Sequence, residues 1–142
     1  PIGSRGLGDV YKRQLYNGSM SELLEQLQSV SHDQEMFYDI LLEIGGDMDD
    51  GTSIRTNENY VSGCQSAVWV TAEKVKDVWD IQTDSDAFMV KGIAKLVAEV
   101  ATPDPSAIRF GDFHSITHNL TIQRQKGMQA IINKIIQLTK GK

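Results

Sequence analysis

The chain has 142 residues, of which 40% are hydrophobic and 23% charged, and its formal net charge is -5 at pH 7. This length suits one domain whose core needs neither disulfides nor a structural metal, and no apolar run approaches the roughly 20 residues that span a bilayer. The negative charge argues against a nucleic-acid partner, because phosphate binding depends on clustered Lys and Arg. We therefore expect a soluble protein, without membrane association, whose partners are proteins or small molecules.

The chain opens with an irregular segment and contains one cysteine, Cys64. The first fourteen residues show neither helical nor strand periodicity, and we expect residues 1–19 to be a non-native or disordered extension before a single domain over residues 20–142. One cysteine cannot form an internal disulfide, and no signal-peptide pattern opens the chain. These features predict a reducing compartment and a cytoplasmic location.

Two helices are predicted first. Ser21 is placed to cap a helix over residues 21–30, and Ser31 and Gln34 have the spacing of a capping box that opens a second helix. The pair Gly45-Gly46 is predicted to end that second helix. Its apolar residues recur at the spacing of a buried stripe, which consists of Phe37, Ile40, Leu41 and Ile44.

A long loop and then a strand pair are predicted in the middle of the chain. Residues 47–62 are rich in Asp, Gly, Thr, Ser and Asn and lack periodicity, which predicts a loop. Aromatic and β-branched residues then alternate with polar ones over Ser66–Glu73 and Asp77–Thr83. This pattern predicts antiparallel strands in a small sheet of about three strands.

Helical periodicity returns after the strands. Asp84 or Ser85 is predicted to cap a helix that stops at Pro103, and Thr121 is predicted to cap a last long helix. Because the strands are grouped rather than alternating with helices, we expect an α+β fold in which N- and C-terminal helices cover a small antiparallel sheet. The predicted inward-facing residues of these two helices are Val90, Ile93, Ala94, Val97, Val100, Met128, Ile131, Ile132, Ile135 and Leu138.

Cys64 stands where the predicted loop meets the first strand, after Gly63 and before Gln65 and Ser66. A glycine at this junction lets a side chain be presented at a loop tip without backbone strain. Free cysteine is also among the most buried residue types and usually packs as a small hydrophobe. Composition alone therefore leaves two interpretations, a reactive thiol and a structural one.

Three ordered segments resemble the SufE family of cysteine desulfurase activators and sulfur acceptors. They are VSGCQSAVWV at Val61–Val70, with RTNEN at Arg55–Asn59 leading into it, DSDAFMVKGIAKL at Asp84–Leu96, and LTIQRQKGM at Leu120–Met128. The similarity spans residues 20–138. The chain departs from the family pattern where Asp and Gly replace loop prolines before the first segment, where Ile122 and Gln123 replace a Pro-Ser pair, and where Asn119 replaces a histidine.

The resemblance implies a sulfur relay in which this protein assists a cysteine desulfurase that uses pyridoxal phosphate. Cys64 would accept the outer sulfur of the desulfurase persulfide and pass it to the scaffold complex of the Suf pathway, or act in the paralogous CsdE-type system. The resting thiol would lie in an apolar recess and turn outward when the partner docks. The chain itself would bind no cofactor and would be a monomer or weak homodimer.

The lone cysteine suits a carrier, because a neighbouring thiol would attack the loaded persulfide, form a disulfide and release sulfide. The resemblance adds supporting and partner-binding residues around it. Each has a plainer interpretation: the tryptophan as a half-buried strand residue, the aspartates as helix caps worth about 1 kcal/mol, and the cations as solvated charges. These predicted residues are Gly63, Gln65, Ser66, Trp69, Asp84, Asp86, Lys91 and Arg124.

Two other functions fit parts of the sequence. One is a non-catalytic module that binds a desulfurase and shifts its conformation while Cys64 is structural. The other is a stand-alone thiol hydrolase that uses His114 or His118 as its base.

Metal sites have weaker support in the sequence. Asp47, Asp49 and Glu58 have the spacing of a calcium loop, but Gly51 and Thr52 occupy positions that require an Asp or Asn and a Gly. The histidine pair has no companion ligand in a recognised zinc pattern. We predict no metal site.

Overall fold

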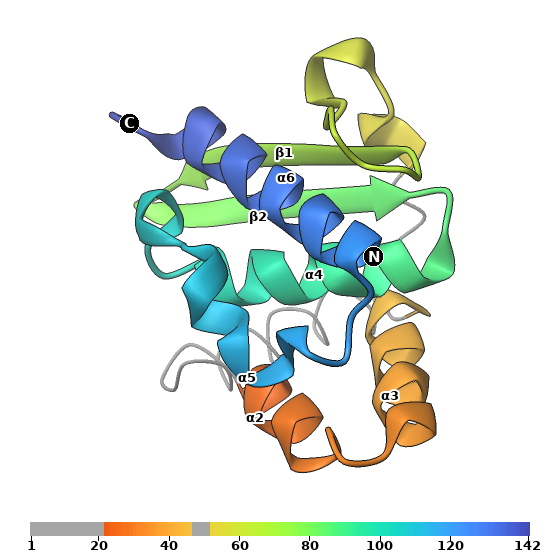
Figure 1. The fold of residues 1–142 in the computed structure, drawn as a ribbon. Helices are drawn as coiled ribbons and strands as arrows, with labels where there is room; N and C mark the ends of the chain where they lie inside the picture. Colours follow the sequence, from red (N-terminus) through yellow and green to blue (C-terminus); the bar gives the residue numbers. More distant parts are fainter. Residues whose placement is uncertain (1–21, 47–51) are drawn as a thin grey trace, which may run out of the picture.

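A computed structural model of the chain describes residues 22–46 and 52–142 (Figure 1). The predicted N-terminal extension, the Ser21 cap, Asp47 and Asp49 lie outside the described residues. The helices and strands are α2 (Glu22–Ser29), α3 (Gln34–Gly46), β1 (Val68–Val75), β2 (Val78–Ser85), α4 (Phe88–Ala101), α5 (His114–Thr117) and α6 (Ile122–Thr139). Short 3-10 turns occur at Thr52–Ile54, Asn57–Asn59, Pro105–Ala107 and Phe110–Phe113.

The sheet is an antiparallel hairpin whose register runs from Val68 opposite Ser85 to Val75 opposite Val78. Its turn residues Lys76 and Asp77 have φ values of 50° and 66°, as a two-residue hairpin turn that follows the strand twist requires. The two strands were predicted correctly, and the α+β class is confirmed.

The expectation of about three strands is wrong for the described residues, which contain two. The nearest approach to a third strand is an isolated antiparallel bridge between Tyr60 and Trp69. The 3-10 turn at Asn57–Asn59 precedes this bridge, and Gly63 follows with a φ of 96°. Neither conformation is extended, so pairing cannot continue on either side.

The helices form a layer on the hairpin (Figure 1). α6 crosses β1, α4 packs along β2, and α3 packs against α4. The contact between α3 and α4 is close because it is built on glycine: a Cβ at Gly92 would lie 2.1 Å from the carbonyl oxygen of Leu41. A Cβ at Gly45 would likewise lie 2.9 Å from the backbone nitrogen of Gly92. Gly45, one of the two glycines predicted to end the helix, is therefore also part of a helix-packing surface.

The core lies between the hairpin and the helices and matches most of the predicted inward-facing residues. Ile40, Val90 and Leu138 are only partly buried and pack against the edge of the core. The predicted residues that are buried are Phe37, Leu41, Ile44, Ile93, Ala94, Val97, Val100, Met128, Ile131, Ile132 and Ile135.

Helix starts agree less well with prediction. Thr121 caps α6 as predicted, because its side-chain oxygen accepts from the Arg124 backbone N–H at 3.2 Å. For α3, Asp33 replaces the predicted capping box, accepting from the Met36 N–H at 3.1 Å. Gln34 instead donates its side-chain amide to the Asn119 carbonyl at 2.8 Å, because a tertiary contact competes for it.

The α4 start also corrects the prediction. Its N-cap residue is Ala87, and no side chain caps the helix. Asp84 and Asp86 are engaged elsewhere, as described below. Ser85 accepts from the Ala87 backbone N–H at 3.2 Å, one residue before the first helical one.

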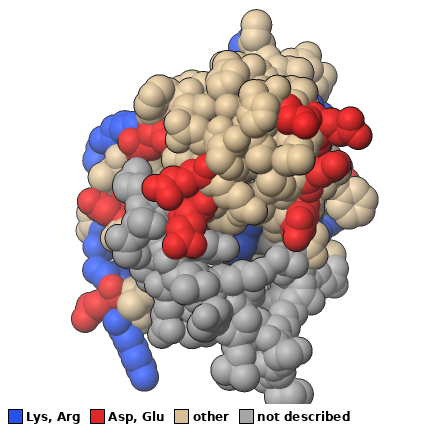
Figure 2. Space-filling view, turned by 90° about the horizontal axis from the view of Figure 1, so that it is seen from below, with Lys and Arg blue, Asp and Glu red and all other residues tan. Residues whose placement is uncertain are grey.

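Acidic side chains gather on the face seen from below (Figure 2). On α3, Glu35, Asp39 and Glu43 are exposed and lie about one turn apart. Such a surface repels a polyanion. Among the helices that the structure describes, none has the length and apolar character to cross a membrane.

Candidate functional site

Cys64 lies in the loop of residues 62–67, called the cysteine loop from here on, which leads into β1. Gly63 precedes it with a φ of 96°, in the region that side chains rarely adopt. The half-buried Cys64 thiol faces α6 and donates to the Gly127 carbonyl oxygen, with the sulfur 3.6 Å from the oxygen. The thiol therefore packs against the core and makes a weak hydrogen bond to α6.

Gly127 is a site residue that the sequence reasoning missed. A Cβ at this position would lie 3.7 Å from the Cys64 sulfur. The thiol thus packs directly on the helix backbone, because Gly127 has no side chain to separate them. The segment LTIQRQKGM contains this glycine, but only the tertiary contact between α6 and the cysteine loop gives it a role.

The base of the cysteine loop is held by several hydrogen bonds. The Val61 N–H donates to the Val68 carbonyl at 2.9 Å. At Ala67, the carbonyl accepts from the Ser85 hydroxyl at 2.7 Å and from the Asp86 N–H at 3.3 Å. The Ala67 N–H donates to the Asp86 carboxylate at 3.2 Å. Asp86 therefore restrains the loop base, and does not cap α4.

Asp84 is wholly buried beside the loop base, within an ion cluster. Its carboxylate lies 2.6 Å from Nε of Arg55 and 3.4 Å from Nζ of Lys91. The Arg55 guanidinium also lies 4.7 Å from the centroid of the Trp69 ring. Trp69 and Asp84 are paired in the hairpin register. The structure thus brings together three predicted residues, and adds Arg55, which the sequence reasoning had placed only in a leading segment.

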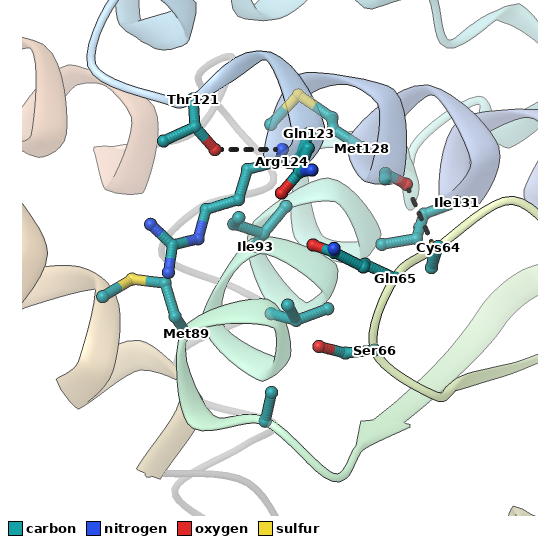
Figure 3. Close-up of a pocket in the computed structure, with 13 residues that line it drawn as sticks. Cys64, Gln65, Ser66, Met89, Ile93, Thr121, Gln123, Arg124, Met128 and Ile131 are labelled. Atoms are coloured by element: carbon teal, nitrogen blue, oxygen red, sulfur yellow. Dashed lines mark hydrogen bonds between the residues drawn. The ribbon is translucent and has the colours of Figure 1, made fainter.

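A pocket of about 240 Å³ opens beside Cys64 (Figure 3). Gln65 extends across it from the cysteine loop, while Arg124 and Met89 lie together at the end away from Cys64. Its lining is mainly apolar side chains from α4 and α6. The lining residues are Cys64, Gln65, Ser66, Ala87, Met89, Val90, Ile93, Thr121, Gln123, Arg124, Gly127, Met128 and Ile131.

Arg124 is held at the pocket by its neighbours. Its guanidinium carbon lies 5.7 Å from the centroid of the Tyr38 ring, within the range of a cation–π contact. The Tyr38 hydroxyl donates to the Asn119 carbonyl at 2.5 Å. Asn119, which stands in the place of the family histidine, therefore ties α3 to the start of α6.

The pocket sets the chemistry of the thiol. Burial raises the pKa of the Cys64 thiol, because desolvation penalises the charged thiolate. The resting thiol is therefore predominantly neutral at pH 7 and is a poor nucleophile. His114 and His118 are exposed and do not line the pocket, which removes the geometric support for a hydrolase with a histidine base. Within residues 22–46 and 52–142, no three His, Cys, Asp or Glu side chains are grouped to hold a metal.

Comparison with known proteins gives the family. The sequence model of the SufE family, described as an Fe-S metabolism associated domain, matches residues 21–139. The chain belongs to the SufE family. The match contains the cysteine loop, the ion cluster and the pocket, so all the geometry above lies within the SufE domain.

Two SufE relatives have similar length. An uncharacterized SufE-like protein of Rhizobium meliloti is 29% identical over 119 residues, covering 74% of this chain and 84% of the relative. An uncharacterized SufE-like protein of Rhizobium etli is 25% identical over 133 residues, covering 85% and 89% respectively. The family associates the chain with iron–sulfur metabolism.

Proposed function

We propose that this SufE family protein is a cytoplasmic sulfur acceptor and carrier. It takes persulfide sulfur from a SufS-like cysteine desulfurase onto Cys64, stimulates that enzyme, and delivers the sulfur to the iron–sulfur cluster assembly scaffold. The observation that carries the proposal is the position of Cys64. The chain's single cysteine lies at a loop tip, on the wall of an apolar pocket, within a domain associated with Fe-S metabolism.

The transfer is a thiolate exchange without net oxidation or reduction. Cys64 loses its proton, and its thiolate attacks the outer sulfur of the desulfurase persulfide. A new S–S bond forms on Cys64, while the old S–S bond breaks and its electron pair leaves with the desulfurase cysteine as a thiolate. Pyridoxal phosphate belongs to the desulfurase, and this chain needs no cofactor for its own step.

The pocket suits a protein that must hold a reactive sulfur. Met128 and Ile131 are fully buried against it, and Ile93 is nearly so. An apolar lining limits access of water and of small thiols that would reduce the persulfide. The chain itself contains no second thiol that could do so.

The contacts of the loop support an outward turn of the thiol during transfer. The loop base has four hydrogen bonds at its two ends, whereas the Cys64 side chain has one thiol–carbonyl contact at 3.6 Å. A sulfhydryl is a weak donor, so breaking this hydrogen bond requires little free energy. Leaving the pocket also removes the burial that raises the thiol pKa.

Mass spectrometry after mixing the protein with a SufS-like desulfurase and cysteine tests the proposal. The peptide that contains Cys64 should gain one sulfur mass, and Cys64→Ser should remain unmodified while it still folds. Stimulation of desulfurase turnover by Cys64→Ser equal to that of the wild type, with no sulfur on the wild-type peptide, would instead favour a non-catalytic binding module.

A further inference from the structure

A second groove, called the lysine groove from here on, runs along the outer face of α6. It has a volume of about 550 Å³. Residues 60–63 form one wall, and α6 residues between Lys126 and Gln137 form the other. Cys64 does not line it. The lysine groove is therefore separate from the thiol pocket.

The lysine groove is positively charged, although the chain as a whole carries a net charge of -5. α6 has three cations and neither Asp nor Glu. Two of these cations, Lys126 and Lys134, line the groove. Among the described residues, no carboxylate forms an ion pair with either lysine. The two positive charges are thus available to an anionic ligand.

The positions of the two lysines set the length of that ligand. Lys134 is held at the groove because its Nζ donates to the Glu58 carbonyl oxygen at 3.0 Å. An ammonium group has three donors, so two remain for a ligand. Lys126 lies eight residues earlier on α6, which corresponds to about 12 Å along the helix axis. A single carboxylate or phosphate cannot contact both cations.

Primary amides line the same wall of the groove. Gln129, Asn133 and Gln137 all contribute to the lining, and the Gln129 amide donates to Oδ1 of Asn133 at 2.8 Å. A primary amide has donors and an acceptor, as a peptide group does. These side chains can therefore hydrogen-bond to an extended backbone that passes from one lysine to the other.

An apolar recess continues the groove toward the start of α6. Ile122 is 70% exposed and lines this recess with Phe110. Lys126 and Gln129 line both the recess and the lysine groove, which makes the two continuous. Ile122 lies four residues before Lys126, about 6 Å along the axis.

We propose that the lysine groove binds an extended acidic peptide segment of another protein. An extended chain advances about 3.3 Å per residue, so the spacings of about 6 and 12 Å correspond to two and four residues. The segment therefore has an apolar side chain at its first position, for Ile122, and carboxylates at its third and seventh, for Lys126 and Lys134. Alternate side chains of an extended strand face one side, and these three positions share that side.

A nucleic acid is the other extended anion that could contact two lysines. Its charge repeats at every nucleotide, and its affinity depends on many phosphate contacts. The groove supplies two cations within an acidic protein. The charge of the chain therefore favours the peptide.

Fluorescence anisotropy at low ionic strength tests the proposal with a fluorescein-labelled heptapeptide. The probe has Phe at its first position, Glu at the third and seventh, and Ser elsewhere. Lys126→Gln and Lys134→Gln should each weaken binding about threefold to fivefold, as expected for exposed charge pairs. Ile122→Ser should also weaken binding of this probe, but not of a probe with Ser at the first position.

Lys140→Gln is the matched control, because this exposed lysine follows α6 and lines neither the groove nor the recess. It removes the same charge and should bind as the wild type does. Lys126 and Lys140 are both exposed, so thermal melting of their variants should match the wild type. Cys64→Ser should also bind the probe normally, because the thiol pocket is separate.

The spacing of the carboxylates provides a second control. Moving the second Glu from the seventh to the sixth position places it on the opposite side of the strand and should weaken binding as much as Gln at the seventh position does. Absence of saturable binding to the wild type would overturn the proposal, as would equal losses in Lys126→Gln and Lys140→Gln. Loss of binding in Cys64→Ser would place the probe in the thiol pocket, and tighter binding of a heptathymidylate would make the groove a nucleic-acid site.

Discussion

The base and the tip of the cysteine loop differ sharply in how they are held. At the base, Ala67 is fastened to Ser85 and Asp86 by three hydrogen bonds, next to the buried carboxylate of Asp84. At the tip, Cys64 has one thiol contact with the Gly127 carbonyl, and Gly63 is exposed. Hydrogen bonds at the base thus set the position of the loop, while the Cys64 sulfur makes only a weak hydrogen bond.

This difference suits a sulfur carrier. A firmly fixed base keeps the thiol at the same position on the protein surface. Less conformational entropy is then lost when a partner docks. A weakly held tip lets the thiol leave its pocket at a small free-energy cost. Substitutions at the base and at the tip should therefore differ in how far they change stability and how far they change the exposure of the thiol.

The largest effect is expected at the base, from Asp84→Ala. Removing the carboxylate leaves Arg55 and Lys91 without their shared counter-charge, and breaking a buried pair is costly. Because these cations are 34% and 17% exposed, solvent offsets part of the loss, and we expect about 2 kcal/mol less unfolding free energy. Urea denaturation measures it. A loss below about 0.5 kcal/mol, within the range of an ordinary surface substitution, would contradict this account of the cluster.

A smaller effect is expected from Gly63→Ala. A Cβ strains a backbone with a φ of 96°, which should lower the unfolding free energy by about 1–2 kcal/mol and displace the thiol. Gly127→Ala is the contrasting variant, because it lies within α6 and its Cβ would meet the Cys64 sulfur at an ordinary 3.7 Å. It should be neutral or stabilising. Equal destabilisation by both variants in thermal melts would count against conformational strain at Gly63.

Asp86→Ala should weaken the hydrogen bonds that hold the base of the cysteine loop. The carboxylate loses its hydrogen bond from the Ala67 N–H, at a site exposed to water, so stability should fall by only about 0.5 kcal/mol. The loosened loop should expose the thiol more often and speed alkylation of Cys64 by iodoacetamide about threefold. Asp39→Ala, an exposed carboxylate on α3, is the control. An unchanged alkylation rate would show that this bond does not restrain the loop.

The smallest effect is expected from pH. Burial raises the folded-state pKa of Cys64 above the ordinary thiol value of about 8.5. The folded state then holds the thiol proton more tightly than the unfolded state does. The resulting stability is fully present below about pH 8.5 and is lost as pH rises through the higher folded-state pKa. Urea titrations across this window should show a loss in wild type that Cys64→Ser lacks, and parallel curves would refute it.

The local sequence pattern was sufficient to predict those elements whose structure depends on residues close together in the chain. Alternation of apolar and polar residues predicted the hairpin, and helical spacing of apolar residues predicted the buried faces of α4 and α6. Each pattern arises because one face of the strand or helix packs on the core. Thr121 was predicted as a cap because its partner N–H is three residues away. The predicted caps at Asp84 and Asp86 failed because the cations of the ion cluster bind the Asp84 carboxylate and the Ala67 N–H binds the Asp86 carboxylate. The predicted capping box of α3 failed for the same kind of reason, a contact between Gln34 and Asn119.

The amino-acid sequence by itself determined the family, the α+β class and the singular thiol, since these depend on residue identity and short-range periodicity. Only the tertiary structure decided that Gly127 faces the thiol and that Arg55 joins Asp84. These pairs are separated by many residues along the chain, and local spacing contains no information on which distant surfaces will meet. They are set by how helices pack on a hairpin, which depends on all the buried side chains together.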